Sequence, residues 1–582
     1  MTRTDTFVVG TLVVVLAIVA GLIGVPALQR ASIAASATAT PRASAPLEAA
    51  RPYVEGAVGA PMSVSPLTAR TQVDRDLVSL VFSGLVRNGP GGTVVPDLAV
   101  RWSVDASGKT WTVDLRPDAL WHDGAPVTAD DVVYTIATLQ NPDYTGPSAS
   151  SWREVTVAAT NPLQVTFTLA TPLGGFLQAL TQPLAPAHLL AGVPIEALPD
   201  DPFGRQPVGA GPFAVTELSD TSASLVPASV LAIDVDGPTP SPAAGATDSL
   251  ATPAPTARPS RPIPYLAGIE FRFYMDPASL AADFRAGAID GASGLSPQLA
   301  AELGAVDGAH LIRYPGATLA AGLLNLRPSH PEFASPAVRT AFLAAIDRGR
   351  LINEAYAGAA QVATGPIPPV SPLYDASVAP AVAYSRTEAG KVLRAAGWTR
   401  DDKGWYLPRI KTPLAIEVLS PTDSTNHALF AAAEAVVRDW RALGFTVTHV
   451  ALPPGEFVTD RLATGTFQVA VADVRIGLDA DLYPLLASSQ TLKGGSNVMG
   501  VQDQALDRLL VKARAPGSDA TRRAAYSTLQ KQLAKGRYLL PLAFPDAVLV
   551  LSDAVDGRVV RQVTDPSDRF WDVLTWRLAV DR

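Results

Sequence analysis

The sequence predicts an α/β fold built from alternating strands and amphipathic helices. The clearest pattern joins a strand candidate at Pro413–Leu419, a long amphipathic helix at His427–Leu443 and a second strand candidate at Phe445–Leu452. Gly444 directly follows the helix, where glycine commonly ends helices in a left-handed conformation. A strand-helix-strand unit of this kind favours two parallel strands in one sheet. With 582 residues, the chain has room for several α/β domains.

The N-terminal half contains elements of both kinds. Lys109–Arg116 alternates apolar and polar side chains, which is typical of a half-buried strand. Thr128 precedes a helical pattern, and Asp131 stands where a capping box places its acid. The turn at His122 and Asp123 is interpreted as structural, because no nucleophile accompanies this pair. The same criteria predict strands at Gln164–Leu169 and Ile269–Phe273 and a helix that starts after Ser335.

The composition excludes several classes of protein. A formal net charge of -8 argues against a nucleic-acid binder, which normally presents a basic face. The chain has no cysteine, which removes disulfides, thiolate metal sites, cysteine nucleophiles and a lipidated N-terminal cysteine. The six histidines are scattered without the spacing of metal ligands. No nucleophile elbow or zinc-protease motif occurs. Ser107–Thr110 resembles the end of a phosphate-binding loop, but the first glycine of that motif would fall at position 103, where this chain has Ser. We therefore predict no enzyme, no cofactor and no metal.

The N-terminus carries a membrane signal. Phe7–Leu28 is an uncharged, mostly apolar run that as a helix would be about 33 Å long, enough to cross a bilayer. It is either a cleaved signal peptide or an uncleaved N-terminal transmembrane helix. Its length favours the anchor, because signal-peptide cores are shorter. Small residues at Ala37–Ala39 leave cleavage open.

Two stretches have the composition of flexible chain. Residues 29–52 are rich in Ala, Ser, Thr and Pro, which predicts a linker after the membrane segment. Gly237–Pro262 has a similar composition and interrupts the folded part of the chain. Because it cannot bury enough apolar surface to become ordered, we expect a disordered insertion in a surface loop.

A series of motifs in a fixed order resembles one protein family. It consists of LVFSGLV at Leu80–Val86, PDLAVRW at Pro96–Trp102, SGKTWTVDLR at Ser107–Arg116, WHDG at Trp121–Gly124 and TADDV at Thr128–Val132. Together they resemble the bacterial extracellular solute-binding proteins of family 5, which serve peptide- and nickel-type ABC importers. An earlier segment at 59–70 resembles the family's opening strand and loop, and later segments continue the resemblance at 206–213, 323–358, 365–375, 388–398 and 496–510. The helix at 520–535 and the run at 538–544 resemble the return into lobe one.

The resemblance implies a type II periplasmic-binding-protein fold, with two α/β lobes around a ligand cleft and an extra subdomain. The implied boundaries are residues 1–28 for the signal or anchor, 29–52 for the linker, 53–84, 204–312 and 528–582 for lobe one, 85–203 for the subdomain and 313–527 for lobe two. The implied function is to capture a peptide or similar small organic solute by hinge closure and to deliver it to a permease. The alternative is a ligand sensor or adhesion module of the same fold without a transporter.

The resemblance also nominates ligand contacts in the cleft. These are Ser65 and Pro66 from lobe one, and Asn325, Arg475, Asp479 and Asn497 from lobe two. Each has a structural alternative: Asn325 and Asn497 would satisfy backbone groups or form a turn, Asp479 would cap a helix through Tyr483 and Leu486, and Arg475 would pair with Asp473 or Asp479.

One departure weakens the peptide assignment. Many relatives hold the α-amine of a peptide with an acid before an Asp-Pro pair, and in this chain that position falls at Ile476. Asp473, Asp479 or Asp481 would have to replace it, or Arg475 would bind a carboxylate instead. Oligopeptides, dipeptides, oligosaccharides and metal chelates all stay open as ligands. The expected protein is a monomer outside the cytoplasm, periplasmic or at the cell surface, that contacts permease subunits and is tethered to the plasma membrane or secreted after cleavage.

Overall fold

The computed structural model describes residues 51–89, 93–144, 146–147, 152, 154–228, 265–378, 380–491 and 495–579. The predicted membrane segment at 7–28, residues 29–50 of the linker and the insertion at 237–262 lie outside the described residues. Within the described part of the chain, no helix combines the length and apolar character needed to cross a membrane.

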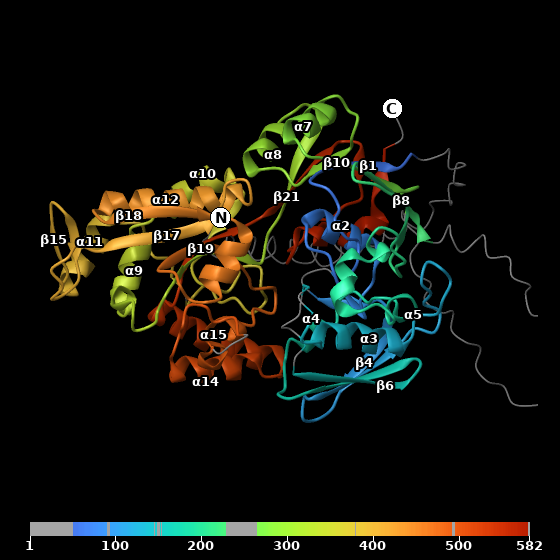
Figure 1. Ribbon diagram of the computed structural model, residues 1–582, viewed down its shortest axis with the longest axis horizontal. Helices are drawn as coiled ribbons and strands as arrows, with labels where there is room; N and C mark the ends of the chain where they lie inside the picture. The colour runs from blue at the N-terminus through green and yellow to red at the C-terminus, as the bar shows by residue number, and fades with distance from the viewer. Residues whose placement is uncertain are drawn as a thin grey trace, which may run out of the picture. The chain divides into compact units, whose positions relative to one another are not determined.

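Lobe one is built on a sheet with the strand order β12-β21-β11-β1-β10-β9-β8 (Figure 1). Strand β1 runs parallel to β10 and β11, whereas the other neighbours are antiparallel. Because its strands come from three separate stretches of the chain, this lobe is discontinuous. The bounds are β1 Tyr53–Val58, α2 Gln72–Val81, β8 Phe213–Leu218, β9 Ser222–Pro227, β10 Ile269–Tyr274, α7 Pro277–Arg285, β11 Gly291–Ser293, α8 Pro297–Leu303, β12 Ala309–Tyr314 and β21 Ala547–Ser552.

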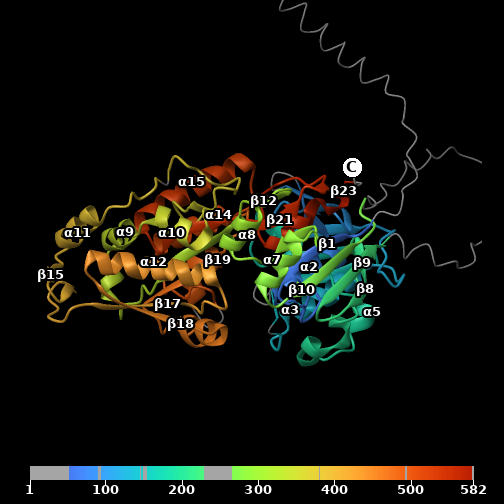
Figure 2. The same ribbon diagram turned by 90° about the horizontal axis from the view of Figure 1, so that it is seen from above.

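Lobe two is built on a second sheet, with the order β14-β20-β13-β19-β17-β18. Strands β17 and β18 are parallel and flank α12, as predicted, and Gly444 ends that helix with a φ of 104°. Figure 2 shows α12 lying along these strands. The bounds are β13 Thr318–Leu324, α9 Pro336–Ala344, α10 Arg348–Tyr356, β14 Ala360–Val362, α11 Arg386–Ala395, β15 Thr399–Asp401, β16 Gly404–Tyr406, β17 Ala415–Pro421, α12 His427–Leu443, β18 Thr446–Leu452, β19 Val469–Arg475, α13 Tyr483–Leu486, α14 Gln504–Arg514, α15 Asp519–Gly536 and β20 Leu540–Pro545.

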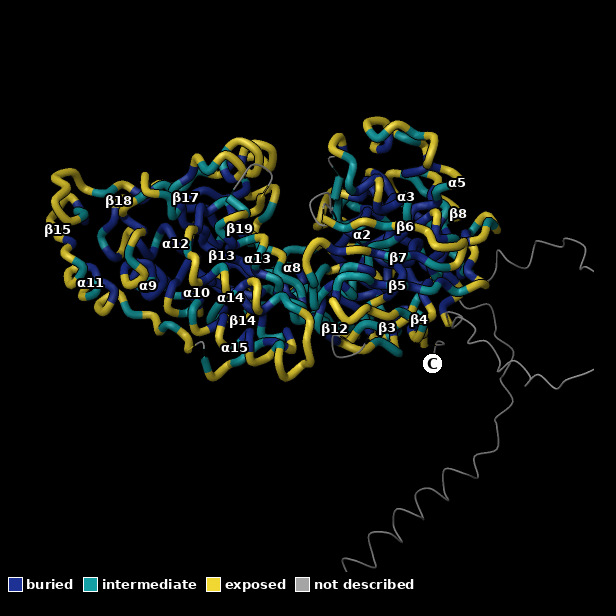
Figure 3. The backbone as a smooth tube through the Cα atoms, turned by 90° about the horizontal axis from the view of Figure 1, so that it is seen from below, coloured by how far each residue is buried: buried dark blue, intermediate teal, exposed yellow. Residues whose placement is uncertain are grey.

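Both faces of the lobe-two sheet are buried. Along β13, Ala320 and Leu324 pack into one apolar core, and Leu319, Ala321 and Leu323 pack into another. A strand covered on both faces has an almost continuous apolar sequence, which explains the run from Leu319 to Leu324. Figure 3 shows this contrast between buried interior strands and exposed outer loops such as the β15 hairpin.

The subdomain contains a sheet of order β4-β5-β7-β6 and the hairpin β2-β3. Strand β5 confirms the alternation predicted for Lys109–Arg116, since Trp111, Val113 and Leu115 are buried. The Asp131 carboxylate accepts a hydrogen bond from the Thr128 amide at 2.8 Å, which completes the predicted capping box. The bounds are β2 Val86–Asn88, β3 Val94–Pro96, β4 Ala99–Val104, β5 Thr110–Leu115, α3 Ala129–Gln140, β6 Val155–Asn161, β7 Gln164–Leu169, α4 Phe176–Ala179 and α5 Ala187–Leu190.

Two short connectors join the lobes. Residues 315–317 lead from β12 in lobe one to β13 in lobe two, and Asp546 leads back from β20 to β21. Short paired crossings of this kind are suited to a hinge, since few backbone torsions separate the two sheets.

Two expectations about segment positions were wrong. Helix α15 and strand β20 were expected to return the chain to lobe one, whose third segment was predicted to begin at residue 528. Instead, β20 pairs with β13 and β14, and the apolar face of α15 packs into a lobe-two core through Tyr526 and Leu529. Residues 59–70 were expected to hold the opening strand and loop, but that strand is β1, which ends at Val58.

The last part of the chain returns to lobe one. It contains a short strand pair, β22 Val555–Asp556 with β23 Arg577–Leu578, and the 3-10 helix η7 Pro566–Thr575. Arg569 of η7 is almost fully buried and forms ion pairs with Glu55 of β1 at 2.5 Å and Asp76 of α2 at 2.7 Å. This cluster ties η7 to β1 and α2, and thereby positions one wall of the site described next.

Candidate ligand-binding cleft

A cavity of about 1290 Å³ is lined by residues of both lobes and the subdomain. Lobe one contributes Pro66, residues from α2 and residues from η7, and the subdomain contributes β2, α4 and the residues after α4. Lobe two contributes Arg475 at the end of β19 and residues of the loop that follows, up to Asp481. Cavities for drug-sized ligands usually measure about 300–1,000 Å³, so this one accepts a larger solute.

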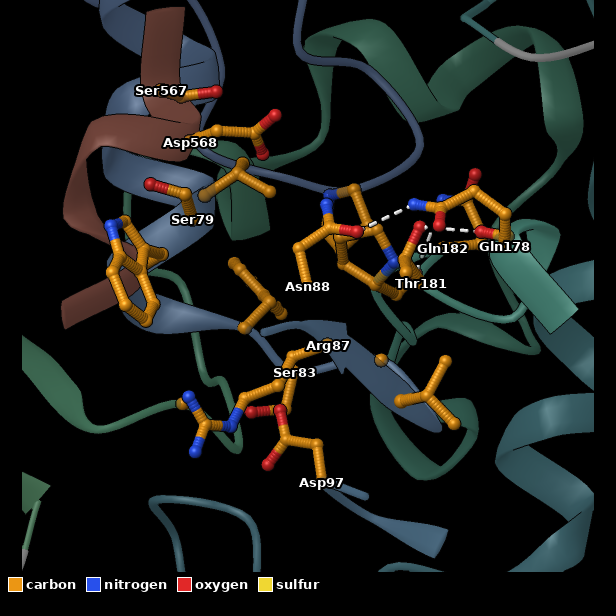
Figure 4. Close-up of a pocket in the computed structure, with 18 of the residues that line it drawn as sticks. Ser79, Ser83, Arg87, Asn88, Asp97, Gln178, Thr181, Gln182, Ser567 and Asp568 are labelled. Carbon is orange, nitrogen blue, oxygen red and sulfur yellow. Dashed lines mark hydrogen bonds between the residues drawn. The ribbon is translucent and has the colours of Figure 1, made fainter. Parts of the chain in front are cut away.

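Neutral polar side chains form one wall of the cavity (Figure 4). Asn88 at the end of β2 accepts a hydrogen bond from the amide of Gln178 in α4 at 2.6 Å. The Thr181 hydroxyl donates to the main-chain carbonyl of Gln178 at 2.8 Å, and Gln182 lies beside these residues. Amides and hydroxyls both donate and accept hydrogen bonds, so this wall suits a ligand with backbone-like amide groups.

A shared carboxylate connects the lobes at the cavity. Asp565 forms ion pairs with Arg75 of α2 at 3.1 Å and with Arg475 of lobe two at 3.0 Å. Burial opposes ionisation of this carboxyl, but the two guanidinium groups, together with hydrogen bonds from Ser567, outweigh it and hold its pKa below the usual value. Since Arg475 is 61% exposed, it keeps donors available on the cavity side.

Asp479 closes the cavity against the subdomain. Its carboxylate accepts a hydrogen bond from Arg522 of α15 at 2.5 Å. The added Cβ of a larger residue at Gly175 would lie 1.8 Å from Asp479 Oδ2, so the loop before α4 approaches lobe two as only glycine allows. Next to it, the Gly174 amide donates to the Arg514 carbonyl at 2.8 Å. Burial raises the pKa of Asp479 despite the nearby Arg522.

The structure brings three of the six predicted contacts to the cavity, namely Pro66, Arg475 and Asp479. The two charged residues have other partners than the sequence predicted. Arg475 pairs with Asp565 rather than with Asp473 or Asp479. Asp479 does not cap α13, because Asp481 accepts the hydrogen bond from the Tyr483 amide at 3.0 Å.

The other three residues, Ser65, Asn325 and Asn497, are buried and outside the cavity lining. The Asn325 amide donates to the carbonyls of Gly465 and Phe467 at 2.9 and 2.7 Å. The Asn497 amide donates to the carbonyls of Ala487 and Val501, both at 3.0 Å. Both asparagines therefore satisfy backbone groups, and Ser65 likewise accepts from the Leu67 amide at 3.3 Å.

His122 and Asp123 make contacts that hold a turn. The His122 Nε2 atom lies 3.1 Å from the Gly211 carbonyl oxygen. Asp123 accepts from the Ala125 amide at 3.0 Å, and its other oxygen lies 2.8 Å from His188 Nε2. Neither residue lines the cavity.

The sequence did not indicate several lining residues. Arg87, Gln178, Arg561 and Trp571 all line the cavity, although about 480 residues separate the first from the last two. No local pattern marks Arg561 or Trp571, because β21 and η7 bring them to the site only after the chain has passed through lobe two and returned.

These features define a class of protein: two α/β lobes, joined by two crossings, with a solute-sized cavity lined by both. Solved structures of that class match the chain at the level of the fold. Bacillus subtilis AppA, an oligopeptide-binding protein in complex with a nonapeptide, aligns with a TM-score of 0.71 and 20% identity over 91% of this chain and 100% of its own. Campylobacter jejuni NikZ, in complex with Ni(L-His), aligns with a TM-score of 0.69 and 22% identity over 90% and 99%.

The sequence comparisons identify the family. The family model of the bacterial extracellular solute-binding proteins, family 5 Middle, matches residues 93–495, which is more than half of the chain. Protein XP55 of Streptomyces lividans is 27% identical over 519 residues, covering 88% of this chain and 86% of that protein. The chain belongs to the bacterial extracellular solute-binding proteins of family 5. It is therefore a solute-binding protein of an ABC importer and not an enzyme.

Proposed function

We propose that the solute bound in this cavity is a peptide. The observation that carries the proposal is the pairing of a large cavity, about 1290 Å³, with a wall of neutral amide and hydroxyl groups. A peptide backbone presents one donor and one acceptor per residue and matches such a wall. Binding of a nonapeptide by AppA, a protein of the same fold, supports this choice.

The α-amine of such a peptide is not held by an acid at the usual position, which is occupied by Ile476. Asp479, the nearest candidate in the same loop, is committed to Arg522 and packs against Gly175. Recognition through backbone groups and through cationic side chains replaces recognition of the amine in this proposal.

Ligand capture follows from closure of the lobes about the two connectors. A ligand that contacts α4 and η7 on one side and the Arg475–Asp481 loop on the other stabilises only the state in which both sides are close. Release to a permease then requires reopening of the hinge and no covalent step.

A thermal-shift screen of the purified full-length protein against defined di-, tri- and oligopeptides tests the proposal. A peptide at 100 times its dissociation constant is expected to add about 2.7 kcal/mol to the free energy of unfolding. If oligosaccharides or metal chelates stabilise the protein and no peptide does, the peptide assignment is wrong.

We further propose that the protein works outside the cytoplasm as a monomer tethered by the apolar segment 7–28. The support is the length and lack of charge of that segment, together with the family to which the chain belongs. Recovery of the protein in the membrane fraction at its full mass is expected. A mature N-terminus beyond Ala39 would exclude the anchor.

A further inference from the structure

Arg561 is a buried arginine at the cavity whose charge has no ion-pair partner within the described residues. Its side chain donates to the Gly89 carbonyl at 3.1 Å and to the Asp568 carbonyl at 3.4 Å, so both acceptors are neutral backbone groups. Its Nε atom is buried and has no hydrogen-bond partner in the part of the chain that the structure describes. The ring of Trp571 holds the guanidinium group in place, with 4.6 Å from the ring centroid to Cζ. The residue as a whole is 7% exposed.

Arg87 supplies a second guanidinium group at the same place. It belongs to β2, two residues before the Gly89 carbonyl that Arg561 contacts, and both arginines line the cavity. Its side chain is exposed and forms no hydrogen bond or ion pair with any described residue. Figure 4 shows its guanidinium group turned away from the cluster of Asn88, Gln178 and Thr181.

The acids around the pair do not neutralise it directly. Asp568 directs its carboxylate to the amides of Thr564 and Asp565, at 2.8 and 3.1 Å. Asp572 accepts from the Val559 amide and from Trp576 Nε1. Asp97 lies near Ser83 and Arg87 in Figure 4, and it interacts electrostatically with Arg116.

The charge state of Arg561 reflects this environment. Burial lowers the pKa of Arg561 and the neighbouring Arg87 lowers it further, whereas Asp568, Asp572 and Tyr314 oppose these effects. Two adjacent cations, one of them desolvated, interact unfavourably until an anion lies between them.

We propose that Arg87 and Arg561 form an anion-binding subsite that receives a carboxylate group of the bound solute. The subsite rests on the proposed function, because it selects among solutes that enter the same cavity. Arg561 is held rigidly and supplies the fixed donor, while exposed Arg87 closes over the anion from β2. Guanidinium groups bind carboxylates with two parallel hydrogen bonds, and partial exclusion of water by Trp571 strengthens such charge-assisted bonds. The favoured ligands are therefore acidic peptides or peptides that present their C-terminal carboxylate here.

The test compares three probes on the full-length protein by isothermal titration calorimetry. These are trialanine, trialanine C-terminal amide and citrate, which separate the carboxylate from the peptide backbone. The variants are Arg87→Gln and Arg87→Lys, with Arg508→Gln as the matched control, because Arg508 is an exposed arginine of α14 outside the cavity lining. Arg87 is chosen over Arg561 because its replacement removes no hydrogen bond or ion pair with a described residue and should leave the fold intact.

The wild-type protein is expected to bind trialanine at least about tenfold more tightly than the amide, which corresponds to about 1.4 kcal/mol. Arg87→Gln should abolish this preference, Arg87→Lys should keep part of it, and Arg508→Gln should leave it unchanged. Equal affinities for acid and amide, or an Arg87→Gln variant that keeps the preference, would overturn the anion subsite while leaving peptide binding in place. Citrate binding that depends on Arg87 without binding of either peptide would keep the subsite and refute the peptide assignment. Failure of all three probes to bind at millimolar concentration would overturn the subsite.

Discussion

Replacing Gly175 by alanine should weaken solute binding without weakening the fold. The new Cβ would lie 1.8 Å from Asp479 Oδ2, where ordinary van der Waals contact begins near 3.4 Å. The subdomain and lobe two would therefore have to separate by about 1.6 Å at this point, the difference between those two distances. Arg522 opposes a swing of the Asp479 side chain because it holds the carboxylate, and Tyr526 fixes the backbone there by donating to the main-chain carbonyl of Asp479 at 3.0 Å.

Overpacking of this kind typically costs about 1–3 kcal/mol. If the cost falls on the closed state alone, the affinity for solute should fall by about 5- to 150-fold. The unfolding free energy of the unliganded protein should change little, since the contact joins two separately folded parts. The matched control is Gly192→Ala in the same subdomain, where an added Cβ meets no atom within 4 Å.

Closure is measured by energy transfer between dyes on engineered cysteines at exposed Ala191 and Ser424, and affinity for trialanine by calorimetry. The chain has no native cysteine, so labelling is specific. Gly175→Ala is expected to lower the closed fraction and the affinity together, whereas Gly192→Ala should match the wild type. A Gly175→Ala protein that closes and binds like the wild type would refute the role of this contact.

Three further outcomes are expected. Arg569→Met leaves Glu55 and Asp76 buried without a counter-ion and should lower the unfolding free energy by about 3–5 kcal/mol in urea denaturation at pH 7; a loss below 1 kcal/mol would contradict this. Asn325→Ala leaves two buried carbonyls without their donor and should cost about 1–3 kcal/mol of stability while the affinity for trialanine stays unchanged; a loss of affinity at unchanged stability would make Asn325 a ligand contact after all. Arg475→Gln removes one of the two cations that pair with Asp565, whose pKa is lowered in the folded state. The ionised carboxylate therefore contributes to the free energy of unfolding above its unfolded pKa of about 3.9, and this contribution is lost as the pH falls through the folded pKa. Because Arg475 is largely exposed, the difference in unfolding free energy should be at most about 1 kcal/mol at pH 7 and should vanish in acid, and a difference that persists below pH 2 would contradict the ion pair.

The sequence was sufficient for elements whose signals are local. Strand β5 and helix α12 were predicted because alternation and helical periodicity arise within the segments themselves, and Gly444 marks the end of α12. The position of β20 was not predictable in this way. Its apolar run fits a buried strand in either lobe, and only pairing with β13 and β14 places it in lobe two.

The site was predictable only in part. Arg475 and Asp479 were nominated by their place in the family resemblance, but their partners Asp565 and Arg522 lie in distant segments. Asn325 and Asn497 carried the same polar signal as ligand contacts, yet their amides serve neighbouring carbonyls. Arg561 and Trp571 meet Arg87 only through the return of the chain to lobe one, which local sequence patterns do not encode.

Native mass spectrometry of the full-length protein, purified after incubation with a defined peptide mixture, tests whether the protein captures a peptide reversibly. Reversible capture predicts a discrete non-covalent adduct that is released on mild denaturation with the mass of a peptide in the mixture, unaltered. A protein that carries no adduct under these conditions, or that releases peptides of changed mass, would contradict it.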